Sequence, residues 1–130
     1  MGQALPPCPV ALVVEDDSAV RDLAAAVLEE TDLAVIACES AEAAISVLER
    51  TDLTVALLFA DVRLPGRMDG ISLARTVESR WPDVRVIVTS GYNEGRNARL
   101  PSGAVFMQKP WRALDVLVQA EHATEAARAA

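Results

Sequence analysis

Residues 10–17 read VALVVEDD, five apolar residues followed at once by three acidic ones. An unbroken apolar run of this length is typical of a strand buried on both faces of a parallel sheet. Asp17 or Ser18 can cap a following helix, because their side-chain oxygens accept hydrogen bonds from its first free N–H groups. The apolar residues after them recur at helical spacing: Val20, Leu23, Ala24, Val27 and Leu28. This stretch therefore predicts a strand, an acidic turn and a helix.

The same alternation repeats along the rest of the chain. Four further apolar segments are predicted strands: 33–38 (LAVIAC), 55–60 (VALLFA), 85–89 (RVIVT) and 104–108 (AVFMQ). Further helices are predicted from Ser40, from about Ile71 to Arg80, and from about Arg112 into the Ala-rich end. Residues 91–103 carry little apolar periodicity, so we expect at most a short helix there. Five strands alternating with helices predict an α/β protein with a parallel sheet covered on both faces and joined by right-handed crossovers.

Length and composition limit the classes of protein to consider. The 130 residues fit a single domain, with residues 1–8 as a flexible leader and 9–127 as the folded core. Hydrophobic residues make up 52% of the chain but aromatic residues only 4%, so the core must consist mainly of aliphatic side chains. Cys8 and Cys38 have neither CxxC spacing nor a partner histidine, which favours two reduced thiols over a metal or redox motif.

The acidic balance argues against two kinds of partner. With a formal net charge of −7 and a pI of about 4.6, the chain is not expected to bind nucleic acid directly or to hold an anionic membrane through a basic patch. No apolar run approaches the roughly 20 residues that a membrane span needs. We therefore expect a cytoplasmic protein.

Polar side chains gather where the predicted strands end. Glu15, Asp16 and Asp17 follow the first strand, Asp61 the third, Thr89 and Ser90 the fourth, and Lys109 the fifth. Carboxyl ends of parallel strands meet at one edge of a sheet, so these groups should converge. Carboxylates about 4 Å apart repel by roughly 4 kcal/mol per pair at an effective dielectric of 20, so a positive charge must balance them. Lys109 and a divalent cation are the natural candidates.

The ligand types favour magnesium and phosphoryl transfer. Oxygen-only ligands suit Mg²⁺, and no His or Cys is placed to select zinc. A carboxylate facing Mg²⁺ can attack phosphorus while the metal, a Lys ammonium and a Thr hydroxyl neutralise the transferring oxygens. The pattern is thus typical of phosphoryl transfer to an aspartate.

Four segments carry a family resemblance: residues 12–17 (LVVEDD), 59–70 (FADVRLPGRMDG), 88–92 (VTSGY) and 108–111 (QKPW). They resemble the receiver domains of response regulators, the phosphoacceptor domains of two-component signalling, in the right order and over almost the whole chain. The resemblance implies a flavodoxin-like (βα)5 fold with strand order 2-1-3-4-5. It also implies partners: a sensor histidine kinase or phosphotransfer protein that donates the phosphoryl group, and a downstream protein. Receiver domains are not enzymes beyond promoting their own phosphorylation and dephosphorylation.

The resemblance assigns a role to each site residue. Asp61 matches the phosphorylated aspartate, while Glu15, Asp16 and the backbone carbonyl of Arg63 match, with Asp61, the ligands of Mg²⁺. Thr89 matches the switch hydroxyl and Lys109 the phosphate-pairing lysine, with Lys109-Pro110 where the family often has a cis peptide. Phe106 stands where many receivers have a switching Tyr, so that any aromatic switch must rely on packing.

The sequence departs from the common pattern in two further places. The loop from Asp61 to Gly70 is one residue longer than usual, with Gly66 and Arg67 before Met68, a difference that bears on access to Asp61. The fourth helix is expected to be short or degenerate, although the family commonly uses it for output.

Three alternatives stay open at this point. A pseudo-receiver would be an interaction module that no longer accepts phosphate. A Mg²⁺-dependent phosphatase with Asp61 as its nucleophile usually carries a second Asp two positions later, where this chain has Arg63. Flavin binding, suggested by fold analogy alone, is weaker because the acidic strand ends would repel a flavin phosphate.

Overall fold

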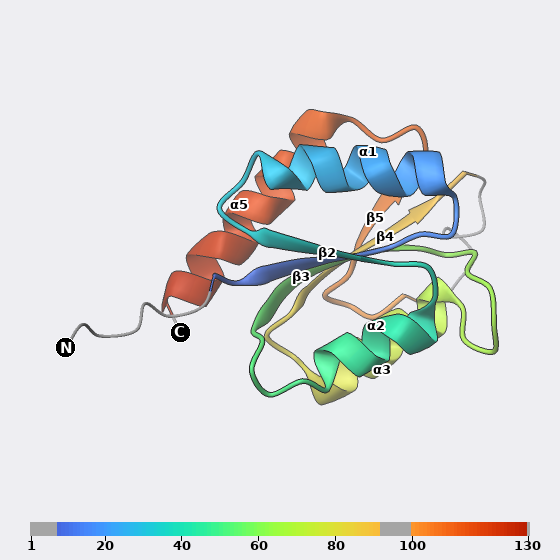
Figure 1. The fold of residues 1–130 in the computed structure, drawn as a ribbon, viewed down its shortest axis with the longest axis horizontal. Coiled ribbons are helices and arrows are strands. Elements are labelled where there is room, and N and C mark those ends of the chain that lie inside the picture. The colour runs from blue at the N-terminus through green and yellow to red at the C-terminus, as the bar shows by residue number, and fades with distance from the viewer. Residues whose placement is uncertain (1–7, 92–99, 130) are drawn as a thin grey trace.

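The computed structural model describes residues 8–91 and 100–129 of the chain. Strands and helices alternate along it (Figure 1). Their bounds are β1 Val10–Val14, α1 Ser18–Glu29, β2 Ala34–Cys38, α2 Ala41–Leu48, β3 Val55–Asp61, α3 Gly70–Arg80, β4 Arg85–Ser90, β5 Val105–Gln108 and α5 Ala113–Ala129. The short or degenerate helix expected between β4 and β5 falls on residues 92–99, outside the described residues.

The five strands form one parallel sheet in the order β2-β1-β3-β4-β5, which confirms the predicted topology. The strand β1 lies between β2 and β3, and its five residues are all buried. The register places Asp61 at the end of β3 beside Thr89 of β4. Two residues that are 28 positions apart in sequence thus become neighbours at the carboxyl edge of the sheet.

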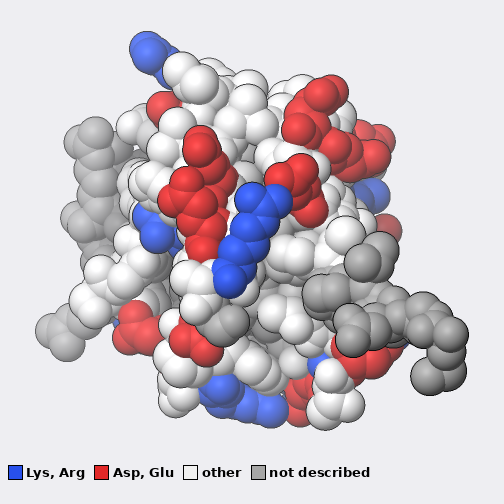
Figure 2. Space-filling view, turned by 90° about the vertical axis from the view of Figure 1, so that its left-hand side faces the viewer, with Lys and Arg blue, Asp and Glu red and all other residues white. Residues whose placement is uncertain are grey.

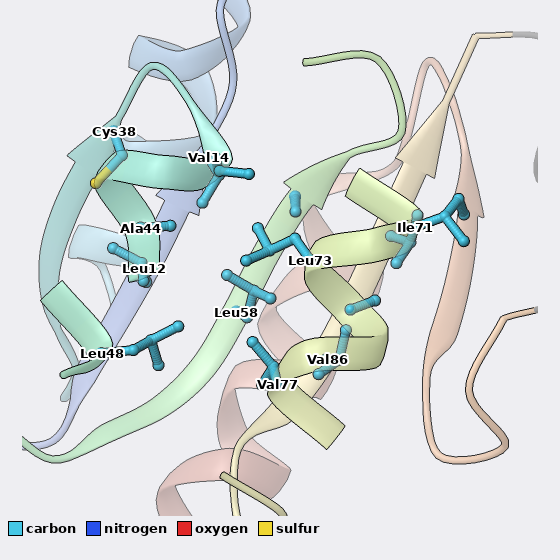
Figure 3. Packing of buried hydrophobic residues seen from close by; sticks show 14 of the residues in the cluster. Leu12, Val14, Cys38, Ala44, Leu48, Leu58, Ile71, Leu73, Val77 and Val86 are labelled. Carbon is cyan, nitrogen blue, oxygen red and sulfur yellow. The ribbon is translucent and has the colours of Figure 1, made fainter. Parts of the chain in front are cut away.

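Helices cover both faces of the sheet, α1 and α5 one face and α2 and α3 the other (Figure 1). Alternate residues of β1 serve different cores, because successive side chains of a strand point to opposite faces. Leu12 and Val14 pack in the layer beneath α2 and α3, together with Leu58 of β3 (Figure 3). Ala11 and Val13 belong to the layer beneath α1 and α5. Full burial of a leucine such as Leu58 contributes about 2 kcal/mol, and the two layers hold the strand ends rigidly.

Capping residues start three of the helices. Asp17 caps α1, its carboxylate accepting from the N–H groups of Ala19 and Val20. Ser40 caps α2 and Asp69 caps α3 in the same way, the latter with a 2.8 Å hydrogen bond from Ser72 N–H. Of the two residues predicted as possible caps of the first helix, Asp17 is the cap, so its carboxylate binds the start of α1.

The apolar residues of α1 differ in how deeply they are buried. Ala24 and Leu28 are buried, but Leu23 is 57% exposed. Neighbouring residues of a helix differ by about 100° in direction, so Leu23 points away from the sheet when Ala24 points towards it.

The surface at the amino end of the strands is mixed in charge. Figure 2 views the end of the molecule opposite the carboxyl edge of the sheet, where separate Lys and Arg side chains lie among Asp and Glu. Arg128 and Asp32 form an exposed ion pair, with Nη2 of the arginine 2.7 Å from Oδ2 of the aspartate. Within the described ranges, the helices are too short or too polar to cross a membrane.

Candidate phosphoacceptor site

Four predicted site residues meet at the carboxyl edge of the sheet. Glu15 directly follows β1, Asp61 ends β3, Thr89 lies in β4, and Lys109 directly follows β5. The backbone N–H of Lys109 donates to the carbonyl of Ser90, 2.8 Å away, which continues the β4–β5 ladder up to the lysine. The Lys109-Pro110 peptide is cis, as the resemblance implied. The sheet itself therefore brings these side chains together.

Lys109 joins the two buried carboxylates. Its Nζ lies 2.8 Å from Asp61 Oδ2 and 3.0 Å from Glu15 Oε2. Glu15 is 1% exposed and Asp61 8%, so both acids depend on this ammonium for much of their charge compensation. Hydrogen bonds between charged groups are among the stronger ones in proteins. Breaking a buried pair of this kind by removing one partner is strongly destabilising.

One carboxylate oxygen each from Glu15, Asp16 and Asp61 lies within 4.8 Å of the others. Asp16 is exposed, so the cluster opens to solvent on its side. Three carboxylates and one ammonium leave two negative charges in excess. An all-oxygen donor set with this excess charge and an open side fits Mg²⁺, which keeps several waters and binds through few carboxylates.

Burial and charge alter the protonation of the site. Burial raises the pKa of Glu15; a hydrogen bond from Lys109 lowers it and the negative charge of Asp61 raises it, leaving the pKa above its ordinary value. Burial lowers the pKa of Lys109, but the hydrogen bonds and charges of Asp61 and Glu15 outweigh that effect, and its pKa is raised overall. Lys109 is therefore held in its charged form at neutral pH.

Thr89 has a buried hydroxyl without a hydrogen-bond partner. Its residue is 0% exposed, and within the described part of the chain its Oγ1 is the buried side-chain oxygen or nitrogen left unpaired. Such a group costs about 1–3 kcal/mol, so its presence in a folded protein calls for an explanation. Thr89 lies beside Asp61 in the β3–β4 register, where it could donate to a group attached to that aspartate.

The other residues singled out in the sequence differ in their position relative to Asp61. The backbone N–H of Arg63 donates to Asp61 Oδ1 at 3.3 Å, so this residue starts its loop beside the acid. Phe106 is half-buried and lines a hollow of about 490 Å³ with Trp111 and Val118. His122 is exposed on α5.

Sequence reasoning missed three residues that support the site. Arg21 on α1 donates from Nη1 to the carbonyl oxygen of Glu15, 3.0 Å away. Gly70 begins α3 so close to β3 that a Cβ there would lie 1.9 Å from the carbonyl oxygen of Asp61. Glu42 on α2 holds the loop that follows Asp61. Of the three, Gly70 alone had a signal in the sequence, because it stands inside the quoted 59–70 segment.

Residues 11–121 match the response regulator receiver domain family. The chain belongs to this family. The receiver domain is 34% identical over 116 residues to the response regulator protein FleR of Pseudomonas aeruginosa, an alignment that covers 86% of this chain and 24% of FleR. It is 35% identical over 103 residues to the sensor kinase CckA of Brucella abortus, covering 77% of this chain and 11% of CckA. The chain thus spans only a minor part of the curated relatives it matches.

Solved structures agree with the flavodoxin-like fold. A response regulator receiver domain protein from Clostridium thermocellum superposes with a TM-score of 0.80 at 21% identity, covering 92% of this receiver domain and 97% of that chain. The receiver domain of NtrX from Brucella abortus superposes with a TM-score of 0.71 at 29% identity, covering 88% and 98%. The five-stranded sheet and its helices are therefore those of a receiver domain over nearly the whole chain.

Proposed function

We propose that this receiver domain accepts a phosphoryl group on Asp61 in a Mg²⁺-dependent reaction. A phosphohistidine of a sensor kinase or phosphotransfer protein is the donor that fits a domain of two-component signalling. The observation that carries the proposal is the arrangement around Asp61. Lys109 pairs with its carboxylate at 2.8 Å, Glu15 and Asp16 add negative charge, and Thr89 presents an unpartnered hydroxyl.

In the proposed reaction a carboxylate oxygen of Asp61 forms a bond to phosphorus while the bond from phosphorus to the donor nitrogen breaks. The carboxylates of Glu15, Asp16 and Asp61 and the carbonyl of Arg63 would hold Mg²⁺. When bound, the metal neutralises charge on the transferring phosphoryl oxygens and on the carboxylates. Lys109 keeps its proton, because its pKa is raised, and is free to move its contact from the Asp61 carboxylate to a phosphoryl oxygen.

The proposed conformational change on phosphorylation starts from the unpaired hydroxyl of Thr89. A phosphoryl group on Asp61 adds strong acceptor oxygens, and the Thr89 hydroxyl can then donate to one of them. We propose that this contact shifts an equilibrium between two arrangements of the end of β4 and of Phe106, whose ring lacks a phenolic hydroxyl and must act by packing. The output is a changed affinity for a downstream protein. We propose a cytoplasmic domain that neither binds nucleic acid nor a membrane, with no catalytic turnover beyond its own phosphorylation and dephosphorylation.

The test is Mg²⁺-dependent modification of the purified protein. Wild type is treated with a small acyl phosphate, and separately with beryllofluoride, with and without Mg²⁺, and the mass of the adduct and binding of the mimic are measured. We expect both only with Mg²⁺, and neither in Asp61→Asn. Asp52→Asn is the matched control, since Asp52 is exposed and pairs with Arg50 away from the site.

Either result is informative. Modification of wild type and Asp52→Asn but not of Asp61→Asn supports the phosphoacceptor. If folded wild type takes up neither reagent under any condition, the chain is a pseudo-receiver that keeps the fold without the chemistry.

A further inference from the structure

Glu42 connects α2 to the loop that follows Asp61. This residue lies in the first turn of α2, and its Oε2 accepts hydrogen bonds from the backbone N–H groups of Arg67 and Met68, both at 3.1 Å. The contact joins positions 25 and 26 residues apart in sequence. A carboxylate that accepts from backbone donors forms a charge-assisted bond, so it fixes the loop more firmly than a neutral contact would.

Gly66 makes this contact possible. Its φ is +92°, in the left-handed region that glycine adopts readily and other residues rarely do. A Cβ at this position would lie 2.7 Å from Glu42 Oε1. The loop is one residue longer than the common receiver spacing, and the Gly66-Arg67 pair that marks the extra length is the part that meets Glu42.

The same loop begins and ends at the phosphoacceptor. At its start Arg63 N–H donates to Asp61 Oδ1, and at its end Gly70 N–H donates to the carbonyl oxygen of Val62 at 2.8 Å. Between these points Leu64 and Met68 pack against the core beneath α2 and α3. The loop is thus held at Asp61, at the end of β3 and at Glu42.

We infer that Glu42 is a positioning residue for the phosphoacceptor site: by fixing residues 66–68 it holds the Arg63 backbone beside Asp61. The inference rests on the proposed function, in which the Arg63 carbonyl helps to hold Mg²⁺. Glu42 acts through the loop, since its described hydrogen bonds reach the backbone of Arg67 and Met68.

The expected effect follows from the population of the competent loop. When one of three anchors is lost, the freed residues regain backbone conformations, and the loop spends only part of its time in the arrangement that serves the site. An apparent affinity falls in proportion to the competent fraction. We expect Glu42→Ala to weaken Mg²⁺ binding and to slow phosphorylation about three- to tenfold, since only part of a charged hydrogen bond is transmitted.

The experiment compares three variants with wild type: Glu42→Ala, Glu42→Gln and Glu49→Ala. Mg²⁺ affinity is measured by calorimetry and the rate of adduct formation by mass spectrometry with a small acyl phosphate, at a temperature where thermal unfolding shows every variant to be folded. Glu42→Gln should stay close to wild type, because its amide oxygen can still accept from both N–H groups. Glu49→Ala removes a carboxylate at the other end of α2, paired with Arg80 at 3.1 Å, and should change neither quantity.

A second pair of variants breaks the same contact from the loop. Gly66→Ala in the wild-type background should reproduce the loss, because its Cβ would displace the Glu42 carboxylate. In the Glu42→Ala background it should add less than its separate effect, since residues that share one contact are not additive.

Equal Mg²⁺ affinity and equal rate in Glu42→Ala and wild type would overturn the inference, even if the melting temperature fell, because Glu42 would then be only a structural brace. Full additivity of the two substitutions would also overturn it. Failure of the proposed function looks different: wild type itself would form no adduct, whereas the Mg²⁺ affinities would still report on Glu42.

Discussion

At the scale of single residues, Thr89 combines two properties that rarely occur together. It is fully buried in a central strand, and its hydroxyl has no partner among the described groups. Lys109, by contrast, is fully engaged with two carboxylates. The unmodified site therefore leaves one donor unused, and that donor lies beside the residue proposed to gain acceptor oxygens.

Thr89→Val should stabilise the unmodified protein. Valine keeps the shape of threonine and removes the unpaired hydroxyl, so we expect the free energy of unfolding to rise by about 1 kcal/mol. The same substitution should leave adduct formation on Asp61 measurable but remove the change that it causes in partner binding. Denaturation with urea measures the first effect, and a loss of stability in Thr89→Val would contradict the idea that the hydroxyl is unsatisfied.

The two cysteines should differ in reactivity. Cys8 is exposed, whereas burial raises the pKa of Cys38. A raised pKa in the folded state means that the protein binds this proton more tightly when folded. The stability that it contributes is present below the unfolded value of about 8.5 and is lost as the pH rises through the folded value.

We therefore expect an aromatic disulfide reagent at pH 8 to label Cys8 at once and Cys38 at least about tenfold more slowly. Counting labelled thiols over time in wild type and in Cys8→Ser measures this. Equal rates at both positions would mean that β2 opens readily at its carboxyl end.

At the scale of elements, the junction between β3 and α3 is the tightest place in the site. Gly70 passes directly over the backbone at Asp61, and a Cβ there would meet the carbonyl oxygen at 1.9 Å and the Val62 Cα at 2.9 Å. Backbone atoms on both sides leave no flexible side chain to give way. The start of the helix and the position of the acid are therefore determined together.

Gly70→Ala should destabilise the protein by about 3 kcal/mol or more, because either α3 or the end of β3 must move. Gly91→Ala is the matched control, since a Cβ at Gly91 would meet no atom within 4 Å and should change stability by less than about 1 kcal/mol. Thermal unfolding of the two variants gives the comparison. A Gly70→Ala protein as stable as Gly91→Ala would show that this junction is loose.

The strands and their ends could be predicted from the sequence, whereas contacts between side chains and backbone groups could not. Apolar runs that stop at Glu15 or Asp61 fix strand ends to within a residue, and a parallel sheet then places those ends together. The role of Glu42 could not be predicted from the sequence, because an acidic residue on the outer side of a short amphipathic helix is normally a solvated surface residue. Its partners are backbone N–H groups, and the residue types along the chain do not indicate which of these groups will bind a side chain. Arg21 was missed for the same reason, since it donates to a carbonyl.

At the scale of the whole molecule, part of the excess negative charge is concentrated in the carboxylate cluster at the carboxyl edge of the sheet. The net charge is −7, and three of the acids form one cluster beside a single ammonium, that of Lys109. Like charges held together oppose folding. Repulsion among these carboxylates should therefore lower the free energy of unfolding of the protein when no cation is bound.

Mg²⁺ should raise the stability of wild type, by about 2.7 kcal/mol at a concentration one hundred times its dissociation constant. Asp16→Asn should behave in the opposite way. Asp16 is exposed, and the ion pairs of Lys109 among the described residues are with Glu15 and Asp61. Its removal therefore relieves repulsion without breaking an ion pair, and stability in a chelating buffer should rise by a few tenths to about 1 kcal/mol. The gain from Mg²⁺ should largely disappear.

Urea denaturation in chelator and in Mg²⁺ measures both effects, with Asp22→Asn, an exposed acid on α1, as the control. If Asp16→Asn is stabilised by Mg²⁺ as strongly as wild type, Asp16 does not hold the metal.

The strands run from the end of the molecule where β1 begins and α5 ends to the end where β3 finishes at Asp61 (Figure 1). Residues 8 and 129 therefore lie at the end of the sheet opposite the acidic cluster. A fluorescent protein, an affinity handle or a solid support attached next to residue 8 or residue 129 would leave Asp61 facing outward. The domain could accordingly be immobilised as a sensing layer in which donor proteins approach from solution and the attachment point does not shield the reacting carboxylate.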